Sequence, residues 1–286
     1  MRRRLPQLNQ CRRPEHRPLI PEKHMIIESR KLLDCAISAA KEAGNHALRN
    51  ISRRKEVLKT FQHDVKLVLD AECQAVAARV IQSAFPKHAI LGEEDSTAAG
   101  NSSGGKYEYQ WVIDPIDGTV NFSHGLPNWC CSIAVRSNGV SVAGAVYLPV
   151  IQELYTAAND LPASRNGEEI HVSTVSNLSK AIVMTGIDKN EGTAAPPFEI
   201  FRRISVSTQK TRVMGAAAAD LCQVASGRAE GYYESGIYIW DVAAAGLIVE
   251  RAGGKAEIIG KQDSNRLSFL ATNGRIHSSL QDLIRS

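Results

Sequence analysis

Residues 111–127 of this chain, WVIDPIDGTVNFSHGLP, constrain its fold and its chemistry more than any other segment. A short apolar run at the start of the segment is typical of the end of a buried strand. The run delivers two carboxylates, Asp114 and Asp117, into a turn that a proline and a glycine make tight. Two carboxylates held close together repel each other, so the turn indicates a cation between them. Oxygen ligands of this kind favour Mg²⁺ or Mn²⁺.

Gly118 and Thr119 follow the two acids directly, where a change from strand to helix leaves backbone N–H groups without an acceptor. The start of a helix binds phosphate for this reason. A metal site and a phosphate site within one short loop would suit an enzyme that hydrolyses phosphate esters with the help of a metal. The alternative is a purely structural turn, because Asp-Pro and Asp-Gly are common turn-forming pairs.

The 286-residue length and the 43% hydrophobic content predict a large core, built from one large or two closely packed units of helices and strands. No run approaches the roughly 18 apolar residues of a membrane span, and the N-terminus lacks the apolar core of a secretory signal. We therefore expect a soluble, cytoplasmic protein without a membrane partner. The six cysteines form no C-x-x-C pair and are expected to be buried thiols.

The formal net charge of +4 is concentrated at the N-terminus. Residues 1–24 contain seven Lys or Arg against two Glu, a net charge of +5, so the rest of the chain carries −1. A nucleic-acid partner is therefore not expected for the folded part. The Pro-rich, weakly hydrophobic segment 1–24 is predicted to be disordered, and the first patterned helix begins at Met25. An overlong start assignment and a transit peptide are both open interpretations of this segment.

Hydrophobic periodicity predicts a first unit over residues 25–180. Helices are expected at 25–50 and 70–85, and strands at 55–61, 89–92, 131–135, 140–148 and 153–157. The strands after Pro127 alternate with turn residues, which favours an antiparallel sheet. Residues 96–106 have the composition of a surface loop.

Beyond residue 180, short strands alternate with helices, which predicts a second α/β unit over residues 181–286. Strands are expected at 182–185, 212–214, 231–234, 256–259 and 267–271. Helices are expected at 198–207, 216–226 and 240–250.

Three separated segments form one pattern: Gly92-Glu93-Glu94, then Asp114-Pro-Ile-Asp117-Gly-Thr119, then Trp240-Asp241-Val-Ala-Ala-Ala-Gly246. Their order and spacing resemble the inositol monophosphatase family, within the lithium-sensitive, Mg²⁺-dependent sugar-phosphatase superfamily. The resemblance runs from about Met25 to the C-terminus. It implies an αβαβα sandwich, with an antiparallel-rich N-terminal sheet and a smaller C-terminal α/β unit that completes the site. It also implies a homodimer.

The resemblance assigns roles to individual residues. Two or three Mg²⁺ ions would be bound by Glu93, Asp114, the carbonyl oxygen of Ile116, Asp117 and Asp241. Asp70 would pair with Thr119 to activate the attacking water, with Glu93 as the third catalytic residue. The substrate would be bound by Gly118, Thr119, Ala217 and Glu234. Lys59 corresponds to a lysine near the site in the family.

Two departures from the family pattern bear on the substrate. The segment before Asp70 lacks the family's threonine, and Ala216 replaces a residue that carries a hydroxyl in inositol-processing relatives. The implied function is a Mg²⁺-dependent phosphomonoesterase that acts on myo-inositol 1-phosphate or a similar small sugar or polyol phosphate. The alternatives are phosphatases for histidinol phosphate, fructose 1,6-bisphosphate or 3′-phosphoadenosine 5′-phosphate, and a non-catalytic regulator that binds RNA or protein.

Overall fold

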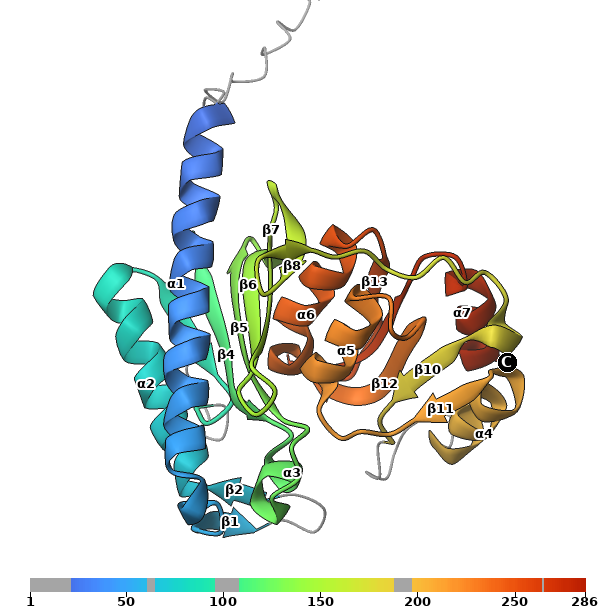
Figure 1. Cartoon of the computed structure of the whole chain (residues 1–286), viewed down its shortest axis with the longest axis horizontal. Coiled ribbons are helices and arrows are strands. Elements are labelled where there is room, and N and C mark those ends of the chain that lie inside the picture. The colour runs from blue at the N-terminus through green and yellow to red at the C-terminus, as the bar shows by residue number, and fades with distance from the viewer. Residues whose placement is uncertain (1–21, 61–64, 96–107, 188–196, 264) are drawn as a thin grey trace, which may run out of the picture.

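The computed structural model describes residues 22–60, 65–95, 108–187, 197–263 and 265–286. These residues form two large mixed sheets, with helices on both faces of each, and a small two-stranded sheet. Across the molecule, the layers are helix, sheet, helix, sheet and helix (Figure 1). This is the αβαβα sandwich that the resemblance implies, so the predicted fold class is confirmed.

The first sheet has the strand order β3-β4-β5-β6-β7-β8-β9 and is antiparallel except for the β3–β4 pair. Its strands are β3 (Ala89–Gly92), β4 (Gln110–Asp117), β5 (Cys130–Ser137), β6 (Val140–Leu148), β7 (Glu153–Ala158), β8 (Leu161–Arg165) and β9 (Glu168–Glu169). Asn138 and Gly139 form the two-residue turn between β5 and β6, and both have the positive φ that such a turn requires. The antiparallel strands predicted after residue 127 are therefore confirmed.

The second sheet has the strand order β11-β10-β12-β14-β13. Its strands are β10 (Ile182–Thr185), β11 (Lys210–Arg212), β12 (Gly231–Tyr238), β13 (Lys255–Lys261) and β14 (Arg266–Thr272). The strand predicted at 212–214 is wrong by two residues, because the chain enters a loop at Val213 and Gly215 there has a φ of 75°.

The helices fill the remaining layers (Figure 1). α1 (Glu22–Arg49) and α2 (Val68–Ala84) cover the outer face of the first sheet, and α5 (Ala217–Ala225) and α6 (Ile239–Arg251) lie between the two sheets. α4 (Pro197–Ser207) and α7 (His277–Arg285) cover the outer face of the second sheet. The short helix α3 (Thr119–His124) follows β4 and contacts the small sheet of β1 (Val57–Thr60) and β2 (Val65–Leu67).

The strand β4 shows how the sequence pattern builds these layers. Trp111 and Ile113 are buried in the hydrophobic cluster under α1 and α2, whereas Val112 is buried in the cluster between the two sheets. Successive side chains of a strand point to opposite faces, so a strand that is covered on both faces is apolar throughout. The uninterrupted apolar run before Asp114 has this cause.

Some predicted boundaries need correction. Helix α1 begins at Glu22, so residues 22–24 belong to the helix and not to the predicted disordered segment. β8, β9 and α7 were not predicted, although α7 buries His277, Leu280 and Ile284 at helical spacing.

Other sequence-based predictions are not tested by the structure. Residues 1–21 and the predicted loop 96–106 lie outside the described residues. The division into units 25–180 and 181–286 and the homodimer stay predictions.

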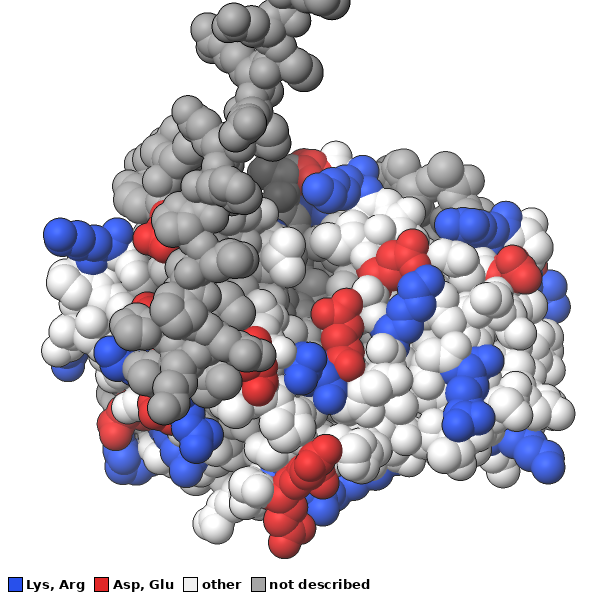
Figure 2. Space-filling view, turned by 90° about the horizontal axis from the view of Figure 1, so that it is seen from above, with Lys and Arg blue, Asp and Glu red and all other residues white. Residues whose placement is uncertain are grey.

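The described surface carries both signs of charge. Figure 2 shows Lys and Arg side chains interspersed with Asp and Glu side chains on one face of the molecule. Among the described residues, such mixing gives this face no extended positive field for a nucleic acid to follow. None of the described helices combines the length and the apolar content that a membrane span requires.

Candidate active site

The end of β4 turns two carboxylates to the same side of the first sheet. Residues three apart in a regular strand point to opposite faces. The register of β4 against β5 shifts between Asp114 and Asp117, where β4 takes three residue steps and β5 takes two. This β-bulge supplies the extra residue that brings both carboxylates into one cavity.

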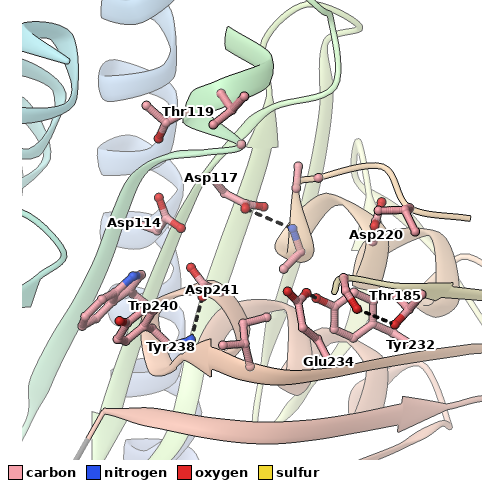
Figure 3. A pocket seen from close by; sticks show the side chains of 18 of the residues that line it. Asp114, Asp117, Thr119, Thr185, Asp220, Tyr232, Glu234, Tyr238, Trp240 and Asp241 are labelled. Carbon is pink, nitrogen blue, oxygen red and sulfur yellow. Dashed lines mark hydrogen bonds between the residues drawn. The ribbon is translucent and has the colours of Figure 1, made fainter. Parts of the chain in front are cut away.

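A third carboxylate comes from the C-terminal half of the chain. Asp241 lies in the first turn of α6, and its Oδ2 accepts a hydrogen bond of 2.8 Å from the backbone N–H of Tyr238. One carboxylate oxygen from each of Asp114, Asp117 and Asp241 lies within 4.8 Å of the other two (Figure 3). The three acids that were expected to share a Mg²⁺ ion therefore meet at one point.

The electrostatics of this cluster favour a bound cation. Burial raises the pKa of Asp114 well above its usual range, and the neighbouring carboxylates raise it further. Burial also raises the pKa of Asp241, followed by the charge of Asp117. Asp114 is 1% exposed, and its Oδ1 has no hydrogen-bond partner among the described residues. A divalent cation would satisfy this oxygen and offset the repulsion, so the donor set fits Mg²⁺.

The cluster lies in a cavity of about 500 Å³, lined by residues from β4, α3, α5, β12 and α6. The described part of the lining contains six acidic side chains and no Lys, Arg or His. The acids are Glu93, Asp114, Asp117, Asp220, Glu234 and Asp241. The lining thus joins both halves of the chain around a strongly acidic interior.

Glu93 follows β3 and lies in the wall of the cavity, outside the cluster of three acids. Its N–H donates to the carbonyl oxygen of Ile113 over 3.1 Å, which continues the β3–β4 pairing. Gln74 of α2 fixes the same turn, because its Oε1 accepts a hydrogen bond of 2.9 Å from the N–H of Glu94. A Cβ added to Gly92 would lie 2.2 Å from this Oε1, so a side chain at position 92 would displace Gln74. The sequence did not identify Gln74 as part of this arrangement.

The turn after β4 differs from the expectation in one contact. Gly118 precedes α3 with a φ of 89°, a conformation that glycine adopts without strain. The Thr119 hydroxyl donates to the carbonyl oxygen of Ile116 over 2.9 Å. Because this hydroxyl has only one proton, the expected hydrogen bond from Thr119 to Asp70 is not formed in this structure.

Asp70 lies in the first turn of α2 and is absent from the described lining of the cavity. It is 2% exposed, and its Oδ2 accepts a hydrogen bond of 2.7 Å from the N–H of Leu67. Its charge still affects the site: the pKa of Glu93 is raised by burial and then by the charges of Asp241 and Asp70. Lys59 lies on β1 with an exposed side chain and is likewise absent from the described lining.

The carboxylate of Asp117 is held by the start of α5. Its Oδ1 accepts a hydrogen bond of 3.0 Å from the N–H of Ala217, and its Oδ2 accepts one of 2.7 Å from the N–H of Ala218. The thiol of Cys130 donates to the same Oδ2 over 3.3 Å. Burial raises the pKa of Asp117, and these donors act in the opposite direction. Ala217 lines the cavity as expected for a substrate contact, but its N–H already binds Asp117.

Glu234 of β12 lies in the same cavity beside Thr185 and Tyr232 (Figure 3). The Tyr232 hydroxyl donates a hydrogen bond to the Glu234 carboxylate. Gly186 packs directly against this carboxylate, because a Cβ added there would lie 2.0 Å from its carbon atom. Any side chain at position 186 would therefore displace Glu234.

Sequence reasoning missed several residues of the cavity. Asp220 lies near the start of α5, and burial, followed by the charges of Asp117 and Glu234, raises its pKa to about 9. A lone acid in the apolar run of residues 216–222 was a usable signal for it. Thr185 and Gly186 gave no such signal, because they meet the Glu234 segment only when β10 pairs with β12.

Comparisons with known proteins agree with this arrangement. The inositol monophosphatase family pattern matches residues 28–285. An inositol monophosphatase from Dictyostelium discoideum is 36% identical over 260 residues, covering 88% of this chain and 94% of that protein. A Nus factor SuhB from Pasteurella multocida is 37% identical over 226 residues, covering 78% of this chain and 83% of that protein.

A solved structure shows the same likeness in three dimensions. The inositol monophosphatase from Anabaena (Nostoc) sp. PCC 7120 matches with a TM-score of 0.79 at 36% identity, covering 90% of this chain and 96% of that one. The family match covers nearly the whole chain and includes all three motifs. This chain therefore belongs to the inositol monophosphatase family.

Proposed function

We propose that this protein is a Mg²⁺-dependent phosphomonoesterase that hydrolyses myo-inositol 1-phosphate or a similar small polyol phosphate. Its family membership makes it a phosphatase. The observation that carries the metal dependence is the convergence of Asp114, Asp117 and Asp241 within 4.8 Å. Mn²⁺ prefers similar oxygen ligands and is the alternative metal.

Five oxygen donors would hold the metal ions: carboxylates of Glu93, Asp114, Asp117 and Asp241, and the carbonyl oxygen of Ile116. Bound Mg²⁺ supplies positive charge to the phosphate and makes a water molecule easier to deprotonate. The protein supplies rigid positions for the ligands. The start of α5 fixes Asp117, and the N–H of Tyr238 fixes Asp241.

The phosphate would lie against Gly118 and Thr119, because the first N–H groups of a helix have no acceptor within it. Glu93 and Asp70 are the proposed groups for activating the attacking water. The pair of Asp70 and Thr119 can form only if the Thr119 hydroxyl turns away from Ile116. That rotation is a requirement of the proposed mechanism.

The part of the cavity around Glu234 and Tyr232 favours a polyol as the leaving group. Glu234 can accept hydrogen bonds from substrate hydroxyls, and the Tyr232 hydroxyl holds its carboxylate in place. A bisphosphate or a nucleotide bisphosphate would require cationic side chains for its second phosphate. The described lining offers six acids and no Lys or Arg, which disfavours those two alternatives.

A panel of phosphate esters, assayed with Mg²⁺ and with EDTA, tests this proposal. We expect Mg²⁺-dependent hydrolysis that is fastest with myo-inositol 1-phosphate and no activity above background with EDTA. Faster turnover of histidinol phosphate, fructose 1,6-bisphosphate or 3′-phosphoadenosine 5′-phosphate would move the assignment to that substrate. Equal rates with Mg²⁺ and with EDTA would refute the metal dependence.

Substitution of Asp241 tests the metal ligands from the C-terminal half. We expect Asp241→Asn to raise the Mg²⁺ concentration for half-maximal activity by about tenfold or more. Residues that only orient a metal ligand already change the metal affinity by about that factor, and Asp241 would be a ligand itself. The amide oxygen can still accept the Tyr238 N–H, so the start of α6 should be kept. Asp282→Asn, at an exposed site on α7, is the matched control. An unchanged Mg²⁺ titration for Asp241→Asn would remove Asp241 from the metal site.

A second candidate function is regulation by binding, because a relative is named Nus factor SuhB. This function would not require hydrolysis. If folded protein hydrolysed no ester of the panel with either Mg²⁺ or Mn²⁺, regulation by binding would become the leading proposal.

A further inference from the structure

Asn121 of α3 connects two segments of the chain. One is the turn that carries Asp114 and Asp117 at the end of β4, called here the metal-binding turn, and the other is a loop from the C-terminal half. Its Nδ2 donates hydrogen bonds of 2.8 Å to the carbonyl oxygens of Asn128 and Met214, and it lies 3.3 Å from the carbonyl oxygen of Gly215. Asn128 supports the same loop, because its Nδ2 donates to Met214 O over 3.1 Å. Two amide side chains after β4 thus bind a loop that lies more than 80 residues further along the chain.

This loop, residues 213–216, leads directly into α5. The first N–H groups of α5 donate to the carboxylate of Asp117, which precedes Asn121 by four residues. The two segments are therefore joined twice: Asp117 binds the start of α5, and Asn121 binds the loop before it. A shift of α5 relative to β4 would break both contacts.

Close packing supports these hydrogen bonds. A Cβ added to Gly118 would lie 3.0 Å from the Cβ of Ala216 and 3.1 Å from the carbonyl oxygen of Gly215. Gly215 has a φ of 75°, and a Cβ added there would lie 3.3 Å from the Nδ2 of Asn121. The turn after β4 and the loop before α5 therefore touch at two glycines, and a side chain at either would push them apart.

The loop is also held from the side of α5. The backbone N–H of Met214 lowers the pKa of the Asp220 carboxyl group, against the larger effect of burial. The carbonyl oxygen of Met214 accepts the hydrogen bonds from Asn121 and Asn128. Met214 is thus bound at its carbonyl oxygen by two amide side chains, which hold the loop that leads into α5.

We propose that Asn121 is a positioning residue that holds α5 against the metal-binding turn and so keeps the Asp117 carboxylate directed toward Asp114 and Asp241. The proposal rests on the proposed metal site. Asn121 itself touches neither metal nor substrate in this account. Its effect passes through the loop 213–216 and the N–H groups of α5.

Two variants test this role. Asn121→Ala removes the donor, and Asn121→Asp keeps the shape but places a carboxylate, which only accepts hydrogen bonds, against carbonyl oxygens. We expect both to raise the half-saturating Mg²⁺ concentration by about tenfold, as for other residues that orient metal ligands. Ser123→Ala in the same helix is the matched control, because its hydroxyl donates only to Val120 O among the described residues, and it should leave the titration unchanged.

Mg²⁺ binding should be followed by tryptophan fluorescence and by thermal unfolding, alongside hydrolysis. Trp240 directly precedes Asp241, so its fluorescence reports on the metal site without catalysis. If wild-type protein binds Mg²⁺ and Asn121→Ala only lowers the Tm in EDTA, Asn121 is structural and the inference is overturned. A wild-type Mg²⁺ titration for Asn121→Asp would also overturn it. If wild-type protein itself shows no Mg²⁺ response, the metal site and this inference fail together.

Discussion

Asp114→Asn is expected to abolish hydrolysis of phosphate esters while the protein stays folded. Asp114 is one of the three acids of the cluster, and its Oδ1 is buried without a hydrogen-bond partner in the described part of the chain. Asparagine has nearly the same shape but lacks the charge that offsets a divalent cation. Losing the metal's charge stabilisation removes several kcal/mol from catalysis, so kcat/KM should fall by about 1000-fold or more.

The stability of the same variant provides an independent check. Burial and the neighbouring acids raise the pKa of Asp114, so the ionised carboxylate destabilises the metal-free fold. The stabilising contribution of Asp114 comes from its protonated form and is fully present below the usual pKa of a carboxyl group. It is lost as the pH rises through the raised pKa that Asp114 has in the folded protein. At pH 8 in EDTA, Asp114→Asn should therefore unfold at the same temperature as wild type or higher.

In the same unfolding experiment, Mg²⁺ should affect wild type and Asp114→Asn differently. It should raise the Tm of wild type, because a ligand that binds only the folded state stabilises it. It should not raise the Tm of Asp114→Asn. Asp282→Asn, at its exposed site on α7, should behave as wild type throughout. Near-wild-type turnover by soluble Asp114→Asn would show that the metal assignment is wrong.

The sequence predicted the parts of the fold that depend on local patterns. The apolar run before Asp114 and the Asn138-Gly139 turn lie where the pattern places them, because burial on both faces and positive φ select particular residue types. β9, with only two residues, is too short to carry a pattern. The start of α1 was missed because Glu22 and Lys23 are polar residues at the edge of an amphipathic pattern.

In the candidate site too, local patterns predicted some features and not others. The three acids of the cluster were identified because they lie in motifs that can be read along the chain. Contacts between distant segments could not be read in this way. Examples are the packing of Gly186 against Glu234 and the hydrogen bonds from Asn121 to Met214. Such contacts depend on which distant strands pair and on how the two halves of the chain pack together, which no local pattern encodes.

Glu234→Gln is expected to discriminate between substrates. The Tyr232 hydroxyl holds the Glu234 carboxylate in the cavity, away from the cluster of Asp114, Asp117 and Asp241 (Figure 3). A charge-assisted hydrogen bond to a substrate hydroxyl contributes about 1.5–3 kcal/mol. The variant should therefore lose about tenfold to hundredfold in kcat/KM on myo-inositol 1-phosphate. An aryl phosphate, whose leaving group has no such hydroxyls, should be hydrolysed nearly as before.

Gly186→Ala tests the same contact without changing any charge. Its Cβ would lie 2.0 Å from the carboxyl carbon of Glu234, so the carboxylate must move while its chemistry stays the same. We expect the same selective loss on the inositol ester for both variants, because each removes a correctly placed acceptor. Equal losses on both esters would mean that Glu234 supports the metal site or the fold. No loss on either ester would mean that the polyol is bound elsewhere, and histidinol phosphate would then be the substrate to test first, since the acidic lining disfavours a second phosphate but not a cationic amine.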